Sequence, residues 1–161
     1  MNARDLRVLA AAAVGVATMT GCAAPPQWRD LGDRAVSFET AWNAVVETST
    51  RHGFTPDDRG TDRGRGLFQS RWRSWTQGFG QSRRMRMRAE LERAEAVDES
   101  LVWHLRFCVE RQSVPDMARS MNPRESDWVS DGQDRDFEDV IEAQLRLRFG
   151  DRVVAPARAA Q

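Results

Sequence analysis

The stretch RMRMRAELE, residues 84–92, decides the fold of this chain. Charged residues in it alternate with the apolar residues Met85, Met87, Ala89 and Leu91. A two-residue period of this kind is typical of a β-strand with one buried face and one face in water. The stretch LVWHLRFCVER, residues 101–111, repeats the period after a short polar loop. The two stretches therefore predict a long antiparallel hairpin.

Charged side chains predict the register of this hairpin. Setting Arg86 opposite Glu110 and Glu90 opposite Arg106 matches opposite charges twice. Such cross-strand pairs contribute up to about 1 kcal/mol each. A slip of two residues would instead bring Arg88 against Arg106. We therefore predict the first register.

Helical periods lie on both sides of the hairpin. Residues 37–52 and 134–149 place apolar side chains at i, i+3 and i+4 spacing, and the second segment has acids at its start and arginines at its end. Residues 67–75 and an extended segment around Phe54 supply two further strands. We predict an α+β fold with a four-stranded, mainly antiparallel sheet and an N-terminal and a C-terminal helix packed on one face.

The predicted core combines the inner faces of these elements. Its members are Phe38, Trp42, Val45, Phe68, Trp72, Met85, Met87, Leu91, Trp103, Leu105, Phe107, Phe137, Ile141 and Leu145.

The first 22 residues, MNARDLRVLAAAAVGVATMTGC, predict where the protein is located. Arg4 and Arg7 precede an apolar run over residues 8–19, and small residues follow, which is the layout of a secretory signal peptide. The run is shorter than the roughly 20 residues that span a bilayer. The tetrapeptide MTGC, ending at Cys22, resembles the lipobox of bacterial lipoproteins. That resemblance implies cleavage before Cys22 and a lipid anchor on its sulfur; the alternative is an ordinary secreted protein.

The remainder of the chain divides simply. We expect a signal peptide over residues 1–21, a Pro-stiffened tether over 22–32 that holds the domain off the membrane, a single α+β domain over 33–150, and a disordered tail over 151–161.

Composition and motifs argue against several classes of function. The chain carries 24 basic and 24 acidic residues, so it lacks the basic excess of a nucleic-acid-binding protein. His52 and His104 stand outside any metal or catalytic motif, and the pair Asp57-Asp58 is typical of a turn. With Cys22 lipidated, Cys108 has no disulfide partner and is expected to be a small strand residue. We predict no enzymatic activity, no metal and no cofactor.

Two surfaces are candidates for binding a partner. The first is an Arg-rich sheet face made of Arg71, Arg73, Arg84, Arg86, Arg88 and Arg106. Interleaved glutamates make a solvated, self-paired face one interpretation, and a docking surface for an acidic partner, anionic lipid or cell-wall polymer the other. The second is the hairpin tip WTQGFG, residues 75–80, where Trp75 and Phe79 either contact a protein or bilayer or fold back onto the core.

The order of elements resembles the helix-grip envelope lipoproteins of the NlpB/BamC type, accessory subunits of the machine that assembles outer-membrane β-barrels. The resemblance covers residues 36–150 and is carried by Ala41-Trp42, His52-Gly53-Phe54, Gly66-Leu67-Phe68 and Arg71-Trp72. It implies a helix-grip domain that works beside another envelope protein.

We therefore predict a membrane-anchored envelope lipoprotein that acts as a non-enzymatic protein-interaction or accessory module. The alternative is a module that binds lipid or polysaccharide in a groove between helices and sheet. Ala23 after the lipidated Cys, in place of an inner-membrane Asp, favours the outer membrane, with the domain facing the periplasm. The sequence leaves the oligomeric state open.

Overall fold

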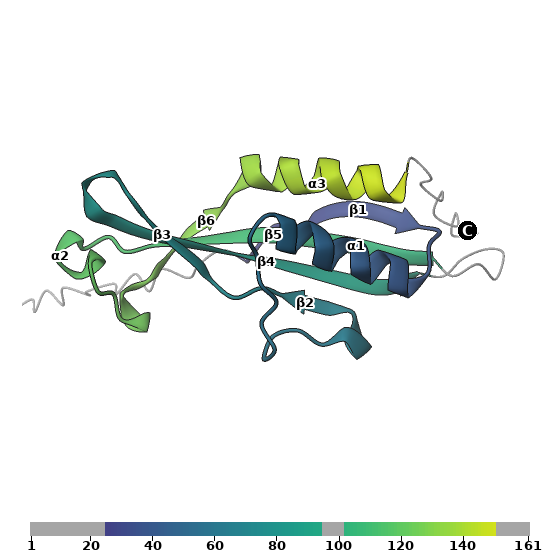
Figure 1. The fold of residues 1–161 in the computed structure, drawn as a ribbon, viewed down its shortest axis with the longest axis horizontal. Coiled ribbons are helices and arrows are strands. Elements are labelled where there is room, and N and C mark those ends of the chain that lie inside the picture. The colour runs from purple at the N-terminus through teal and green to yellow at the C-terminus, as the bar shows by residue number, and fades with distance from the viewer. Residues whose placement is uncertain (1–24, 95–101, 151–161) are drawn as a thin grey trace, which may run out of the picture.

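The computed structural model describes residues 25–94 and 102–150. The expected signal peptide, Cys22 and the expected tail lie outside the described residues. In the described part, the chain folds as one sheet with two long helices and one short one (Figure 1). The strands are β1 (Arg29–Arg34), β2 (Leu67–Gln69), β3 (Arg73–Gln77), β4 (Gln81–Ala94), β5 (Val102–Ser113) and β6 (Val129–Gln133), and the helices are α1 (Phe38–Arg51), α2 (Met117–Ser120) and α3 (Arg135–Phe149).

The long strands β4 and β5 form the spine of the sheet, and each changes its outer neighbour halfway along. β5 pairs first with β1 and then with β6, while β4 pairs with β3 and then with β2. All these pairings are antiparallel. The sheet thus has a half bordered by β1 and β2, and a distal half bordered by β3 and β6.

The α+β class and the antiparallel sheet are confirmed, but the expected count of four strands is wrong, because the sheet has six. Residues 29–34 form β1, although residues 22–32 were expected to be a tether outside the domain. β6 arises from the connection after β5, and residues 67–75 divide into β2 and the start of β3. The segment after Phe54 makes only an isolated bridge, between Pro56 and Ser70.

The predicted register of the central hairpin is confirmed. Arg86 lies opposite Glu110 and Glu90 opposite Arg106, while Arg88 faces Cys108. Opposite charges therefore meet across the outer face of the strands, as the alternation of the two sequences requires.

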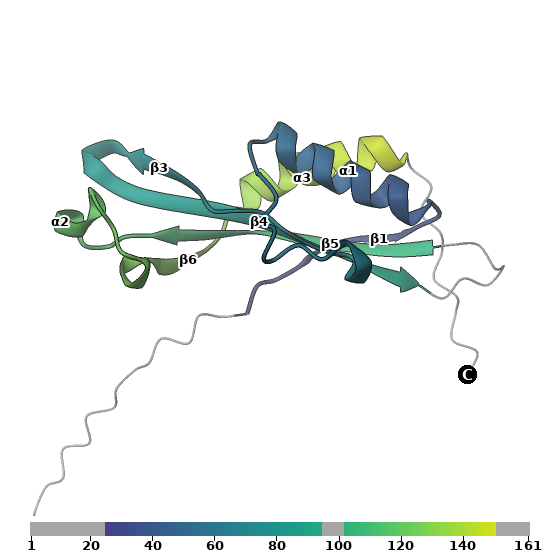
Figure 2. The same cartoon turned by 60° about the horizontal axis from the view of Figure 1, so that its bottom comes forward.

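Both long helices begin at a side chain that accepts a hydrogen bond from the first turn. Ser37 accepts one from the N–H of Thr40, and Asp134 accepts one from the N–H of Phe137. Gly53, with φ of 79°, follows the end of α1 and lets the chain reverse. α1 and α3 lie on the same side of the sheet, and the distal half with β3 extends beyond them (Figure 2).

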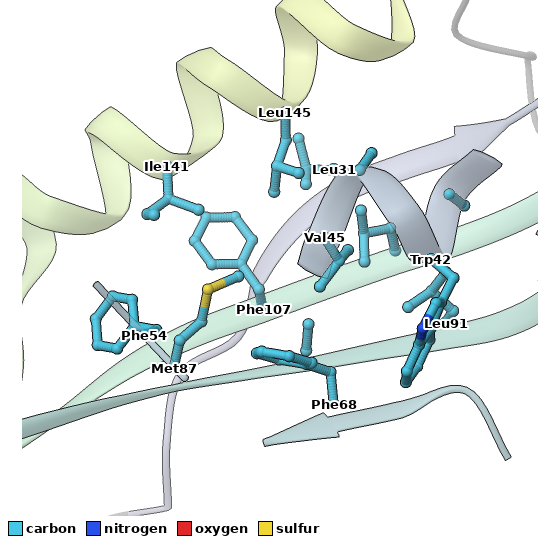
Figure 3. Close-up of a cluster of buried hydrophobic side chains, with 14 of the residues drawn as sticks. Leu31, Trp42, Val45, Phe54, Phe68, Met87, Leu91, Phe107, Ile141 and Leu145 are labelled. Atoms are coloured by element: carbon cyan, nitrogen blue, oxygen red, sulfur yellow. The ribbon is translucent and has the colours of Figure 1, made fainter. Parts of the chain in front are cut away.

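The core lies between this helical layer and the sheet (Figure 3). Ten of the predicted core residues are buried: Trp42, Val45, Phe68, Met85, Met87, Leu91, Leu105, Phe107, Ile141 and Leu145. Phe38, Trp103 and Phe137 pack against them while partly exposed. Trp72 is a wrong prediction, because it stacks on arginines of the opposite sheet face. Phe54, fully buried in a T-shaped contact with Phe137, was missed.

Candidate binding surface

The sheet face opposite the helices carries three tryptophans and four arginines, which we call the Trp–Arg layer. Alternation along β4 explains the arginines: Met85 and Met87 turn inward, so their neighbours turn outward. The members of the layer are Trp28, Trp72, Trp128, Arg84, Arg86, Arg88 and Arg106.

The distal part of the layer is a stack of alternating rings and guanidinium groups. Arg84 Cζ lies 4.5 Å from the ring centroid of Trp72 and 4.5 Å from that of Trp128. Arg86 Cζ also lies 4.5 Å from the Trp72 centroid. The planar guanidinium suits such stacking better than an ammonium does. Each contact contributes about 0.5–1 kcal/mol at an exposed site and about 2 kcal/mol or more where the groups are removed from water, as at the buried Arg84.

The other part of the layer is centred on Trp28, immediately before β1. Arg88 Cζ lies 5.2 Å and Arg106 Cζ 5.3 Å from the Trp28 ring centroid. Arg29, the next residue, points to the helical side, where it pairs with Glu138 and Asp139 of α3. The strand period therefore turns Trp28 outward onto the arginines.

Carboxylates neutralise every arginine of the layer. Glu125 accepts hydrogen bonds from both Nη atoms of Arg84. Glu110 bridges two arginines, with Oε2 2.6 Å from Arg86 Nε and Oε1 3.0 Å from Arg88 Nη1. These pairs hold the guanidinium groups over the tryptophan rings.

Arg106 completes the neutralisation through Glu90 and Glu92, at 2.7 Å from Nε and 3.2 Å from Nη2 respectively. The hydrogen bond that Arg106 donates to Glu90 raises the pKa of Arg106 above its ordinary value. Four positive charges thus face four negative ones, so long-range attraction for an acidic partner is weak at this surface. The layer offers aromatic area and fixed hydrogen-bonding groups instead.

The structure brings together four of the six arginines expected on this face and separates the other two. Arg73 pairs with Met85 in the sheet and so lies on the helical side, where Nη1 donates to the carbonyl of His52 at 2.8 Å. Arg71 lies in the exposed link between β2 and β3, 3.4 Å from Asp58. Placing Arg73 on the outer face was wrong because β3 is a separate strand with its own register.

The hairpin tip is built from β3, the turn Gly78–Gly80 and the start of β4. Trp75 pairs with Arg83 and is half-buried against the core, on the helical side of the sheet. The side chain of Phe79 lies outside the described part of the structure. The tip and the Trp–Arg layer are therefore separate surfaces on opposite faces.

Sequence reasoning missed all three tryptophans of the layer. Trp28 lies in the expected tether, Trp72 was placed in the core, and Trp128 lies in the connection after β5. A compositional signal was present: the chain has six tryptophans, and all its basic residues are arginine. That pairing of residue types favours cation–π stacking, although it does not say which residues meet.

Two titratable side chains at this face, Cys108 and His104, lie among residues that explain them structurally. Cys108 is fully buried opposite Arg88, and burial raises the pKa of its thiol to about 12. His104 lies 2.8 Å from Asp33 and 3.3 Å from Asp30. Over residues 25–94 and 102–150, no group of three or more potential metal-binding side chains is present.

A second opening lies at the margin of the helical layer, where α1 begins. It is an apolar pocket of about 600 Å³ lined by Phe38 of α1, Leu91 and Trp103 of the sheet, and the turn around Gly64. Val45, Phe107 and Leu145, in the core between the helices and the sheet, are fully buried.

Comparison with known proteins does not assign the chain to a family. No family model matches the chain, and no curated protein matches it. The resemblance to helix-grip envelope lipoproteins stays a prediction. None of the helices in the described ranges is long and apolar enough to cross a bilayer.

Proposed function

We propose that this protein is a bacterial envelope lipoprotein, anchored by lipid on Cys22, and that it acts as a non-enzymatic protein-interaction module through the Trp–Arg layer. The observation that carries the proposal is the stack of Arg84 between Trp72 and Trp128. Tryptophan and arginine are the residues most enriched among those that dominate the binding energy of protein interfaces.

The layer is also held in place before any partner arrives. Glu125 fixes Arg84, and Glu110 fixes Arg86 and Arg88. A surface whose side chains are already ordered loses less conformational entropy on binding, which favours affinity. Because the charges of the layer are balanced, we do not expect a strongly acidic partner. We expect a partner with a polar surface that can pack against the tryptophan rings.

The helices and the leader fit the same proposal. We propose that α1 and α3 close one face of the sheet and so leave the other face for the partner. Cys22 would hold the domain at the membrane, and Ala23 favours the outer membrane. Anchoring of this kind raises the effective concentration of the layer near a membrane-bound partner.

Site-specific photo-crosslinking in cells tests the interaction surface. A crosslinker at Ser74, which pairs with Arg84 on the outer face, should capture an envelope protein. The matched position is the exposed Val140 of α3, on the helical side, which should not capture it. Trp128→Ala should abolish the Ser74 product. Equal capture at both positions, or a Ser74 product that survives Trp128→Ala, would reject the layer as the contact surface.

The anchor has its own test. Cys22→Ser should move the protein from the membrane fraction to the soluble fraction of the envelope. Membrane association that is unchanged in this variant would show that Cys22 is not the anchor.

A second candidate function rests on the pocket at the start of α1. Its lining by Phe38, Leu91 and Trp103 suits an acyl chain, as a lipid-binding module would require. Phe38→Gln, at a partly exposed position of the lining, should then weaken binding of a fluorescent fatty acid, and Val140→Gln should not. Binding that is unaffected by Phe38→Gln would reject this pocket as a lipid site.

A further inference from the structure

A pocket of about 430 Å³ opens at the border of the Trp–Arg layer, between the N-terminal segment and β6. Residues 25–27 form one side of it and Trp72 forms another. The floor consists of outward side chains of β5 and β6: Glu110, Gln112 and Ser130. Its volume lies within the range of about 300–1,000 Å³ that is usual for small-molecule sites.

The N-terminal side of the pocket is fastened to the domain by Gln27. Its backbone N–H donates to Gln133 Oε1 at 2.8 Å, and its carbonyl accepts from Gln133 Nε2 at 3.0 Å. Its side-chain Oε1 accepts from Arg135 Nη2 at 2.6 Å. Gln27 thereby holds Pro25 and Pro26 in the lining of the pocket, which Trp72 also lines.

The charged groups of the pocket are already neutralised. Glu110 accepts hydrogen bonds from Arg86 and Arg88, and Arg135 pairs with the buried Glu138 at 2.8 Å. An ionic ligand would therefore have to displace an existing ion pair. The pocket suits an uncharged ligand.

The polar groups of the floor suit a ligand with many hydroxyl groups. Gln112 Oε1 accepts from Arg84 Nε at 2.7 Å, which fixes the orientation of the amide and directs its NH₂ end away from Arg84. Each oxygen of Glu110 has a second lone pair beyond its bond to arginine, and Ser130 adds an exposed hydroxyl. Fixed acceptors and donors beside an aromatic ring match a sugar, which presents hydroxyl groups at its rim and C–H groups on its faces.

We infer that this pocket binds a neutral saccharide, with Pro25 and Pro26 against its C–H groups, Trp72 at its side, and Glu110, Gln112 and Ser130 bonded to its hydroxyl groups. This site goes beyond the proposed protein contact. It shares Trp72 with the Trp–Arg layer, whereas Ser130 is not a member of that layer.

The test compares two neighbouring positions of β6. Ser130 pairs with Gln112 and faces the pocket, whereas Val129 pairs with Ser113 and faces the other side of the sheet. Ser130→Tyr should fill the pocket, and Val129→Tyr places the same side chain on the opposite face. Both positions are exposed, so both variants should fold.

The full-length chain, held in a detergent without a sugar headgroup, is titrated with four neutral trisaccharides: chitotriose, cellotriose, maltotriose and mannotriose. Trigalacturonate serves as the anionic comparison. Binding is followed by isothermal titration and by NMR of the tryptophan indole groups. We expect at least one neutral trisaccharide to bind, with affinity about tenfold weaker in Ser130→Tyr and unchanged in Val129→Tyr.

Three results would overturn the inference: no neutral trisaccharide binds below about 10 mM, trigalacturonate binds more tightly, or Ser130→Tyr leaves binding intact. A proline-rich decapeptide is titrated in parallel. Binding of this peptide alone, lost in Ser130→Tyr, would reject a saccharide site in favour of a peptide site. The crosslinking at Ser74 reports on the protein partner separately, so either proposal can fail without the other.

Discussion

The carboxylate of Glu138 in α3 accepts a hydrogen bond from the backbone N–H of Val109 in β5, at 2.8 Å. Val109 lies between the stretch of β5 that pairs with β1, ending at Phe107, and the stretch that pairs with β6, beginning at Glu110. At the point where β5 changes its neighbour from β1 to β6, the side chain of Glu138 thus accepts the hydrogen bond that a neighbouring strand would otherwise accept. Glu138 is fully buried, and its other oxygen pairs with Arg135 and Arg29.

Replacing Glu138 should therefore be among the costliest single changes in the fold. Glu138→Ala leaves the Val109 N–H and two guanidinium groups without this acceptor, and should lower the free energy of unfolding by about 3–5 kcal/mol. Glu138→Gln keeps an oxygen for Val109 and should cost less, about 1–3 kcal/mol. Urea denaturation measures both.

The control for this series is Glu142→Gln, one turn further along α3. Glu142 is partly exposed and pairs with Arg29 and Arg146, so its loss should cost less than about 1 kcal/mol. Equal losses for Glu138→Gln and Glu142→Gln would contradict the special role of Glu138.

Arg84 should not tolerate lysine, although the charge is kept. Its guanidinium stacks between Trp72 and Trp128, and the residue is only 6% exposed. An ammonium cannot reproduce that planar contact. We expect Arg84→Lys to lower the free energy of unfolding by about 1–2 kcal/mol. The exposed Arg71 provides the comparison, since Arg71→Lys should change stability by less than about 0.5 kcal/mol. Indistinguishable variants would mean that the stack contributes no stability.

Cys108 should make stability fall at alkaline pH. Burial raises the pKa of its thiol from 9.0 to about 12, so above pH 9 the unfolded chain loses the proton while the folded chain keeps it. The stabilising contribution is complete below pH 9 and declines by about 1.4 kcal/mol per pH unit as the pH rises toward 12. Urea titrations from pH 8 to pH 10.5 should show a steeper decline for the natural chain than for Cys108→Ala. Parallel declines would refute the assignment.

Glu125 should titrate below its ordinary range because of Arg84. The hydrogen bonds from the Arg84 guanidinium lower the pKa of Glu125 from its ordinary 4.5. Its stabilising contribution is therefore present above pH 4.5 and is lost as the pH falls through the lowered value. A carboxyl-carbon NMR titration should give a midpoint below 4.5, and Arg84→Gln should return the midpoint upward. A midpoint that does not respond to Arg84→Gln would show that the pair does not form in solution.

The parts of the fold that sequence could predict are those with a strict local period. The alternation over residues 84–92, together with matched charges, was enough to predict the central register. β1 was not predicted because it has two arginines on its inner face. Arg29 pairs there with the buried Glu138, and Arg34 donates to the carbonyl of Leu31. Charged residues on the inner face remove the alternation of apolar and polar residues by which a strand is predicted from sequence.

The binding surface was less predictable, because its members meet only in three dimensions. Arg84, Arg86, Arg88 and Arg106 share a face by local period and were correctly grouped. Trp28 and Trp128 join them from segments without any period, on either side of the central hairpin. Contacts between such segments depend on the path of the whole chain, which no local pattern records.

The hydrogen bonds of Gln27 with Gln133 and Arg135 also limit how far the domain can move away from the membrane. Only five residue steps separate Gln27 from Cys22, and one extended step covers at most about 3.6 Å. With lipid on Cys22, Gln27 would therefore stay within about 18 Å of Cys22. With so short a connection, the domain would rotate at the bilayer surface but could not reach partners far from the membrane. Whatever it binds would have to come to the membrane.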